Sequence, residues 1–131
     1  MKRIENKKVK DVMTYGVVAI PEDSSVMDVA RIFVEANVHG VVVMSNRNEP
    51  LGVISELDLP KAFGKDFRQV NVKEIYNTPI STVNMDESIK KAGEIMKEKH
   101  IHRLIVVDEN NRIRGVLSIS DIIKDIYYSE K

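Results

Sequence analysis

Several features are missing from this chain of 131 residues, and each absence excludes a class of protein. There is no cysteine, which excludes disulfide bonds and thiolate chemistry and agrees with a reducing compartment. The 20 basic residues balance the 20 acidic ones, so no net field draws the chain to nucleic acid or to an anionic membrane. The longest apolar run, Val41 to Met44, is far shorter than the roughly 20 residues of a membrane span. The basic start, Met1 to Lys10, lacks the apolar segment of a signal peptide. We therefore expect a cytoplasmic protein that binds neither membranes nor nucleic acid directly.

What the chain does have is an internal repeat. Residues 9–62 align with residues 72–125 without a gap, and many of the aligned residues are identical. The identical pairs include Gly52 and Gly115, Val53 and Val116, Ser55 and Ser118, Asp58 and Asp121, and Lys61 and Lys124. A polar residue that recurs at one position of a repeat is less easily an accident of surface composition. Each copy, at about 55 residues, is marginally stable alone, so we expect the copies to share a core.

The same order of elements is predicted in each copy. Apolar residues at helical spacing predict a helix from Val26 and another from Ile89. Short β-prone runs predict strands, and the continuous apolar runs Val41 to Met44 and Leu104 to Val107 predict strands that are buried on both faces. The strand runs are Val17 to Ile20, Val41 to Met44 and Leu51 to Ile54, then Ile80 to Val83, Leu104 to Val107 and Ile113 to Leu117. A final helix starts near Glu56 and near Ile119, which gives a β-α-β-β-α unit twice.

This pattern predicts an α/β (α+β) protein with two small sheets, each covered by helices on one side. We assign residues 1–63 to the first repeat with an N-terminal extension, 64–71 to a short linker, and 72–131 to the second repeat with a C-terminal helix. We expect the repeats to be related by pseudo-twofold symmetry and to pack sheet to sheet.

The most informative polar motif is Gly52 to Asp58, which returns as Gly115 to Asp121. Each copy places Ser-x-x-Asp where a strand leads into a helix. One interpretation is a capping box, in which Ser accepts from a helix amide and Asp accepts from the Ser amide. The other is a binding site, because a helix N-terminus attracts phosphate and an ionised Asp accepts hydrogen bonds from ribose hydroxyls.

The motif Gly-hydrophobic-hydrophobic-Ser-x-x-Asp, present twice at the end of a β-α-β-β-α unit, resembles the cystathionine-β-synthase (CBS) domain, which occurs in tandem pairs called Bateman modules. Further matches are Val9 to Thr14 and His100 to Asp108. Two positions depart from the family pattern, Val42 and Ile105, where a proline is usual. The resemblance implies a regulatory module that binds AMP, ADP, ATP or S-adenosylmethionine in clefts between the two repeats.

The resemblance also implies the residues of each cleft. The first cleft would use Val53, Ser55 and Asp58 with Asn77, Ile80, Thr82, Ile101, His102 and Arg103. The second would use Val116, Ser118 and Asp121 with Thr14, Val17, Ala19, Val38 and His39. In both, Asp would hold the ribose hydroxyls, Ser and the helix amides would approach phosphate, and the first strand would contact adenine.

The two clefts are predicted to be unequal. Arg103 beside His102 would give the Asp58 cleft a permanent charge for phosphate, whereas His39 is followed by Gly40. The sequence therefore favours the Asp58 cleft for a nucleotide and leaves the Asp121 cleft open to a nucleoside, an uncharged-tail ligand or no ligand.

The leading hypothesis is a non-catalytic adenosine-ligand sensor that forms a homodimer through exposed helix faces and signals to an unknown partner protein in trans. The alternative is a structural or interaction module whose Ser-x-x-Asp boxes only cap helices. An enzyme is disfavoured because no activated nucleophile or phosphate loop is present. A metal site at His100, His102 and Asp58 is also disfavoured, since zinc needs three or four converging ligands and the chain has no cysteine.

Overall fold

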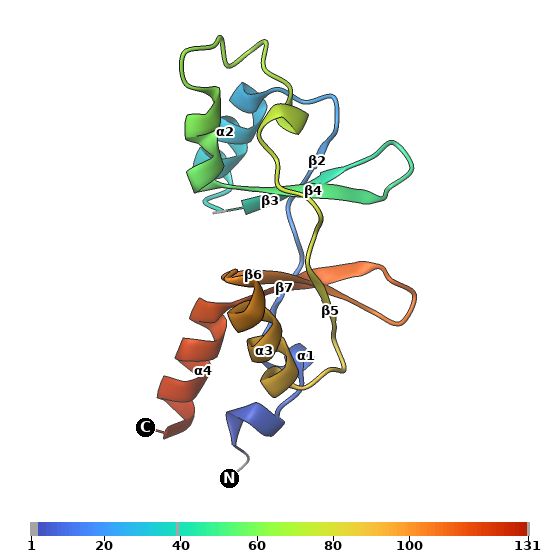
Figure 1. The fold of residues 1–131 in the computed structure, drawn as a ribbon, viewed down its shortest axis with the longest axis vertical. Helices are drawn as coiled ribbons and strands as arrows, with labels where there is room; N and C mark the ends of the chain where they lie inside the picture. The colour runs from blue at the N-terminus through green and yellow to red at the C-terminus, as the bar shows by residue number, and fades with distance from the viewer. Residues whose placement is uncertain (1–2, 39, 131) are drawn as a thin grey trace. The chain divides into compact units, whose positions relative to one another are not determined.

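The computed structural model describes residues 3–38 and 40–130. The chain divides into two compact units (Figure 1). Unit 1 comprises Met1–Val17 and Ser81–Lys131, and unit 2 comprises Val18–Ile80. No helix of the described residues is both long and apolar enough to cross a membrane.

Unit 2 is a three-stranded sheet in the order β2-β3-β4 with helices on one side (Figure 1). Strands β2 and β3 are parallel, and β3 and β4 are antiparallel. The parallel pair requires a crossover, which helix α2 provides. In chain order the elements are β2 (Ala19–Pro21), α2 (Val26–Glu35), β3 (Gly40–Met44), β4 (Pro50–Ser55) and the 3-10 helices η2 (Glu56–Ala62) and η3 (Val72–Glu74).

Unit 1 repeats this plan with one extra strand, in the order β1-β7-β6-β5. Strands β5 and β6 are parallel, while β7 pairs antiparallel with β6 on one side and with β1 on the other. Its elements are η1 (Ile4–Asn6), α1 (Val9–Val12), β1 (Thr14–Tyr15), β5 (Thr82–Asn84), α3 (Ile89–Lys99), β6 (Arg103–Val107), β7 (Ile113–Ser118) and α4 (Ile119–Glu130).

The helices begin where the sequence predicts them. Ser25 caps α2 by accepting from the amide of Asp28 at 3.2 Å, and Ser88 caps α3 by accepting from Lys91 at 3.1 Å. The apolar runs predicted as buried strands are the central strands β3 and β6, confirming that interpretation. The first strand of each copy lies slightly later than predicted, in β2 and β5.

The final helix of the first repeat departs from the prediction. Residues 56–62 form a 3-10 helix, whereas the equivalent segment of the second repeat begins the α-helix α4. Pro60 lies inside η2, and a proline in a helix interior removes one backbone donor and clashes with the preceding turn. The position equivalent to Pro60 is Ile123, which carries no such restriction.

The two units are offset from the two sequence repeats, because each repeat contributes its leading segment to the other repeat's unit. Val9, at the start of repeat 1, is fully buried in the core of unit 1. Its equivalent Val72, together with Ile75, lies in the core of unit 2. The clustered buried residues form one core in each unit, and a core shared between the repeats stays a prediction. The borrowed segments supply apolar surface that each short repeat lacks.

Candidate Ser-x-x-Asp sites

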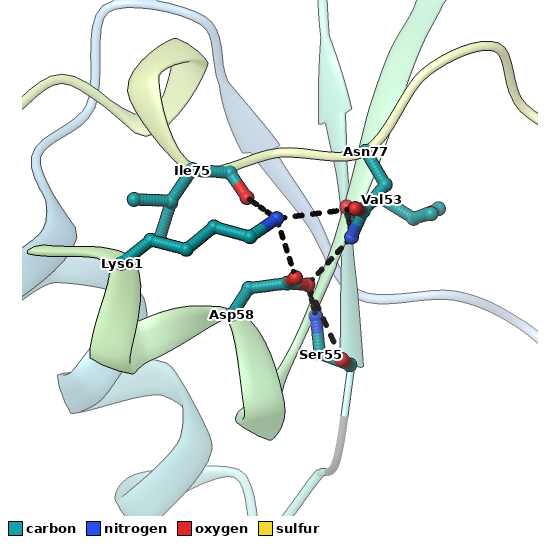
Figure 2. Close-up of polar contacts among 6 residues, drawn as sticks. All are labelled: Val53, Ser55, Asp58, Lys61, Ile75 and Asn77. Carbon is teal, nitrogen blue, oxygen red and sulfur yellow. Dashed lines mark hydrogen bonds and ion pairs between the residues drawn. The ribbon is translucent and has the colours of Figure 1, made fainter.

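Asp58 lies at the centre of a closed polar network in unit 2 (Figure 2). Its Oδ2 accepts from the Ser55 amide at 2.7 Å, from the Ser55 hydroxyl at 3.2 Å and from Asn77 Nδ2 at 2.7 Å. Its Oδ1 forms an ion pair with Lys61 Nζ at 2.9 Å. The Lys61 ammonium also donates to the Ile75 carbonyl and to Asn77 Oδ1, at 3.3 and 3.2 Å. The residue is only 5% exposed, so the network satisfies a buried carboxylate.

The network determines the charge of Asp58. Burial raises the pKa of this carboxyl, but the hydrogen bond from the Ser55 amide and the contacts with Lys61 and Asn77 outweigh burial. The pKa of Asp58 therefore lies below its ordinary value, and the side chain is ionised at neutral pH.

Asp121 occupies the equivalent position in unit 1 with fewer partners. Its Oδ2 accepts from the Ser118 amide at 3.0 Å, and its amide donates to the Ser118 hydroxyl at 3.1 Å, which completes a reciprocal capping box. Its Oδ1 accepts from the Thr14 hydroxyl at 3.1 Å. Asp121 also lines an open cavity of about 340 Å³ with two further carboxylates, Asp11 and Asp125, and with Val12, Lys124 and Tyr128. Both Ser-x-x-Asp boxes therefore stabilise their helix starts, whatever else they do.

The exchanged leading segments supply the third residue of each site. Thr14 is paired with Val116 across β1 and β7, and the equivalent Asn77 forms a bridge with Val53. The repeated glycines allow these segments to approach. A Cβ atom on Gly115 would collide with the carbonyl oxygen of Thr14, and one on Gly52 would lie 2.9 Å from the carbonyl oxygen of Asn77. The Gly of the motif is thus explained by close backbone contact rather than by the ligand.

The strand register places Arg103 beside the Asp121 box. Arg103 on β6 lies directly opposite Ser118 on β7, and the amide of Ile119 donates to the carbonyl of His102 at 2.9 Å. Residues opposite one another in an antiparallel pair project from the same face of the sheet. In unit 2 the residue opposite Ser55 is Gly40, which has no side chain.

The structure brings together part of each predicted set. Unit 2 joins Val53, Ser55, Asp58 and Asn77, and unit 1 joins Thr14, Val116, Ser118 and Asp121. Of the other predicted residues, Ile80, Ala19 and Val38 belong to unit 2, and Thr82, Ile101, His102, Arg103 and Val17 belong to unit 1. Val38 and Ile101 pack against the core of their own unit. His39 lies outside the described residues. Combining residues of the two units in one cleft stays a prediction.

Lys61 was not predicted as a site residue from the sequence. The residue recurs as Lys124, and its position three residues after Asp58 on a predicted helix was the available signal. Among the described residues, Lys61 is the ionic partner of Asp58, whereas Lys124 lines the cavity beside Asp121 without a hydrogen bond or ion pair to it.

Comparison with known proteins decides the family. The profile of the CBS domain matches residues 9–65 and 72–128. The chain belongs to the CBS-domain family and carries a tandem pair. It is similar to uncharacterized protein MJ1232 of Methanocaldococcus jannaschii, with 34% identity over 94% of this chain and 40% of that protein. It is also 30% identical, over 94% of its length, to a quarter of the homoserine O-acetyltransferase of Methanosalsum zhilinae. The chain thus spans less than half the length of these two curated relatives.

Solved CBS pairs have the same mixed α/β fold with two sheets. The CBS domain pair of protein MJ0100, solved with 5′-methylthioadenosine and S-adenosyl-L-methionine, matches 96% of this chain and 99% of its own, with a TM-score of 0.82 and 22% identity. A CBS domain protein from Pyrobaculum aerophilum, complexed with AMP, matches 88% of this chain and 89% of its own, with a TM-score of 0.78 and 28% identity. The prediction of a tandem CBS pair is confirmed.

Proposed function

We propose that this CBS pair is a non-catalytic regulatory module that binds an adenosine-containing ligand at its Ser-x-x-Asp sites. The observation that carries the proposal is the pair of ionisable carboxylates, Asp58 and Asp121, each positioned by its own Ser amide where a strand enters a helix. A carboxylate is acceptor-only, so it suits two adjacent ribose hydroxyls.

The start of α4 adds a site for phosphate. This helix spans 12 residues, and its N-terminus carries a partial positive charge. The amides of Ile119 and Asp121 already donate to His102 and Ser118, so the partial charge, rather than these two amides, would attract phosphate. Arg103 lies on the neighbouring strand, opposite Ser118. With ribose on Asp121, the phosphate would lie near the helix start and Arg103, which both carry positive charge.

Similar proteins have been solved with different adenosine compounds, which supports an adenosine ligand but does not specify which one. The Pyrobaculum aerophilum protein, which is 28% identical, was solved with AMP. We favour AMP or ADP over S-adenosylmethionine because a cationic sulfonium would gain nothing from the Arg103 charge.

Ligand binding would act by population shift. A ligand stabilises the conformation that it binds better, by no more than its difference in affinity between conformations. A partner protein, or a further domain joined to the chain, would then read the bound conformation.

The test is thermal unfolding with a panel of AMP, ADP, ATP, S-adenosylmethionine and adenosine, with GMP as the control. A ligand at 100 times its dissociation constant adds about 2.7 kcal/mol to the free energy of unfolding, or a few degrees in Tm. We expect a shift with at least one adenosine ligand and none with GMP. No shift with any adenosine ligand would favour the alternative, a structural CBS module whose boxes only cap helices.

A further inference from the structure

The two equivalent aspartates differ in what they leave free for a ligand. Building on the proposed function, we propose that the Asp121 site binds the adenosine ligand. We also propose that Lys61, by its ion pair with Asp58, prevents a ligand from binding to the Asp58 carboxylate. From the sequence we predicted the opposite, a nucleotide in the Asp58 cleft, because the family resemblance placed Arg103 beside Asp58.

The Asp58 carboxylate is already fully engaged at one oxygen and ion-paired at the other. Oδ2 receives three donors, from Ser55 and Asn77, and Oδ1 receives Lys61. The Lys61 ammonium has three protons, and three acceptors lie within hydrogen-bond distance, on Asp58, Ile75 and Asn77. A ribose could reach this 5% exposed group only by breaking contacts among charged and polar partners.

The ion pair between Asp58 and Lys61 forms within one turn of a 3-10 helix. In a 3-10 helix there are three residues per turn, so side chains three apart are stacked directly above one another. Asp58 and Lys61 have that spacing in η2, where Pro60 lies between them. Asp121 and Lys124 have the same spacing in the α-helix α4, but among the described residues no ion pair joins them. An α-helix also allows an ion pair at this spacing, as Asp28 and Arg31 show in α2.

The Asp121 carboxylate remains available. Each of its oxygens accepts one hydrogen bond, from Ser118 or from Thr14, and each therefore retains a second acceptor position. The residue is half-buried and lines the 340 Å³ cavity. Within the described part of the chain, Lys124 makes no ion pair with Asp121, so it does not occupy the acceptor positions.

Arg103, which the sequence-based prediction placed in the Asp58 cleft, lies in the same unit as Asp121. Arg103 is exposed, lies in the same unit, and projects from the same sheet face as Ser118. Asp58 has Gly40 at the equivalent place. An exposed guanidinium next to a helix start suits a phosphate, so the ligand class is an adenosine monophosphate or diphosphate.

Isothermal titration with AMP tests the proposal through its stoichiometry and affinity. We expect the unaltered chain to bind a single AMP. Asp121→Asn should weaken AMP binding by roughly 10- to 100-fold, because it removes a charge-assisted acceptor, and it should weaken binding more than Asp58→Asn does. Lys61→Met should make the Asp58 site available, so that the chain binds two AMP molecules instead of one. Lys65→Met, which removes a lysine that pairs with Glu74, is the matched control and should not.

The outcomes separate the inference from the proposed function. If Asp58→Asn abolishes AMP binding and Asp121→Asn does not, the inference is wrong while the proposed function stands. If Lys61→Met still binds a single AMP, the closing role of Lys61 is wrong. If the unaltered chain binds none of the adenosine ligands, the proposed function itself fails. Thermal unfolding of each variant without ligand confirms that it is folded, and Lys61→Met, which keeps both carboxylates, tests the proposal even if Asp58→Asn does not fold.

Discussion

Identical residues at equivalent positions of the two repeats have different surroundings. Asp58 and Asp121 follow the same Ser at the same spacing, yet one is closed by a lysine and the other is not. Asp58 has Lys61 and Asn77 as further partners, whereas Asp121 has Thr14 at the position equivalent to Asn77. The identical glycines, by contrast, have the same function in both copies, because each allows the exchanged segment to approach.

The glycine explanation predicts a stability effect. Gly115→Ala should lower the free energy of unfolding by about 1–3 kcal/mol, because its Cβ atom would collide with the Thr14 backbone. Gly93→Ala is the control: it lies within α3 with nothing within 4 Å of the added atom, so it should raise stability by about 0.5–1 kcal/mol. Urea unfolding of both variants measures the difference. Equal effects of the two substitutions would contradict close packing at Gly115.

The Asp58 network predicts a pH dependence. Because the folded-state pKa of Asp58 lies below the unfolded value of about 3.9, its stabilisation is fully present above that value and is lost as pH falls through the folded-state pKa. The stability difference between the unaltered chain and Asp58→Asn should be constant from about pH 7 to 5 and shrink below about pH 4. Urea unfolding across this range measures it. A difference that persists unchanged at pH 2 would contradict an ionised, hydrogen-bonded Asp58.

At the scale of elements, most of the fold could be predicted from sequence periodicity. The helices from Val26 and Ile89 and the buried central strands follow from apolar spacing and Ser caps. The short strand Thr14–Tyr15 could not be predicted, since its pairing with β7 is a long-range contact with no local signal. Nor could the 3-10 form of η2, although Pro60 was visible in the sequence.

The candidate sites were predictable to a similar degree. The repeat and the family resemblance identified Ser55, Asp58, Ser118 and Asp121, and the structure adds that each has a residue of an exchanged segment beside it. The assignment of Arg103 depended on strand register, which the sequence pattern does not give.

The exchanged leading segments predict which unit each mutation destabilises. Val9 and Val72 are equivalent and both fully buried, but Val9 lies in the unit 1 core and Val72 in the unit 2 core. Val9→Ala should lower amide protection in β6 and β7, and Val72→Ala in β3 and β4, at a cost of about 2 kcal/mol each. Hydrogen exchange measured by mass spectrometry locates the change. Loss of protection within the mutated residue's own sequence repeat would contradict the exchange.

At the scale of the whole molecule, the chain is a pair of similar units that we propose to act as a homodimeric ligand sensor. Each unit exposes apolar side chains on its helices. Val34 in unit 2 is 81% exposed and Leu57 is 87% exposed, while Ile123 on α4 in unit 1 is 58% exposed. Val34 also lines a shallow groove with Phe33 and Leu59. Large exposed apolar residues on a folded domain indicate an interaction surface.

If the homodimer forms through the apolar residues around Val34 in unit 2, a charge at Val34 should prevent association. Val34→Glu should shift the chain from dimer to monomer in sedimentation equilibrium, because burying an unpaired carboxylate costs several kcal/mol. Arg47→Glu, in the exposed turn between β3 and β4, is the control and should leave the dimer intact. A monomeric unaltered chain, or a dimer that survives Val34→Glu, would contradict a homodimer formed through this face.

We propose above all that an adenosine ligand binds at the Ser118–Asp121 box. A crystal structure of the chain with AMP tests it most directly. We predict ribose hydroxyls within hydrogen-bond distance of the Asp121 carboxylate, phosphate at the start of α4, and the Asp58 to Lys61 ion pair unchanged. Ribose on Asp58 with Lys61 displaced, or AMP absent from both aspartates at saturating concentration, would contradict a ligand site at Asp121.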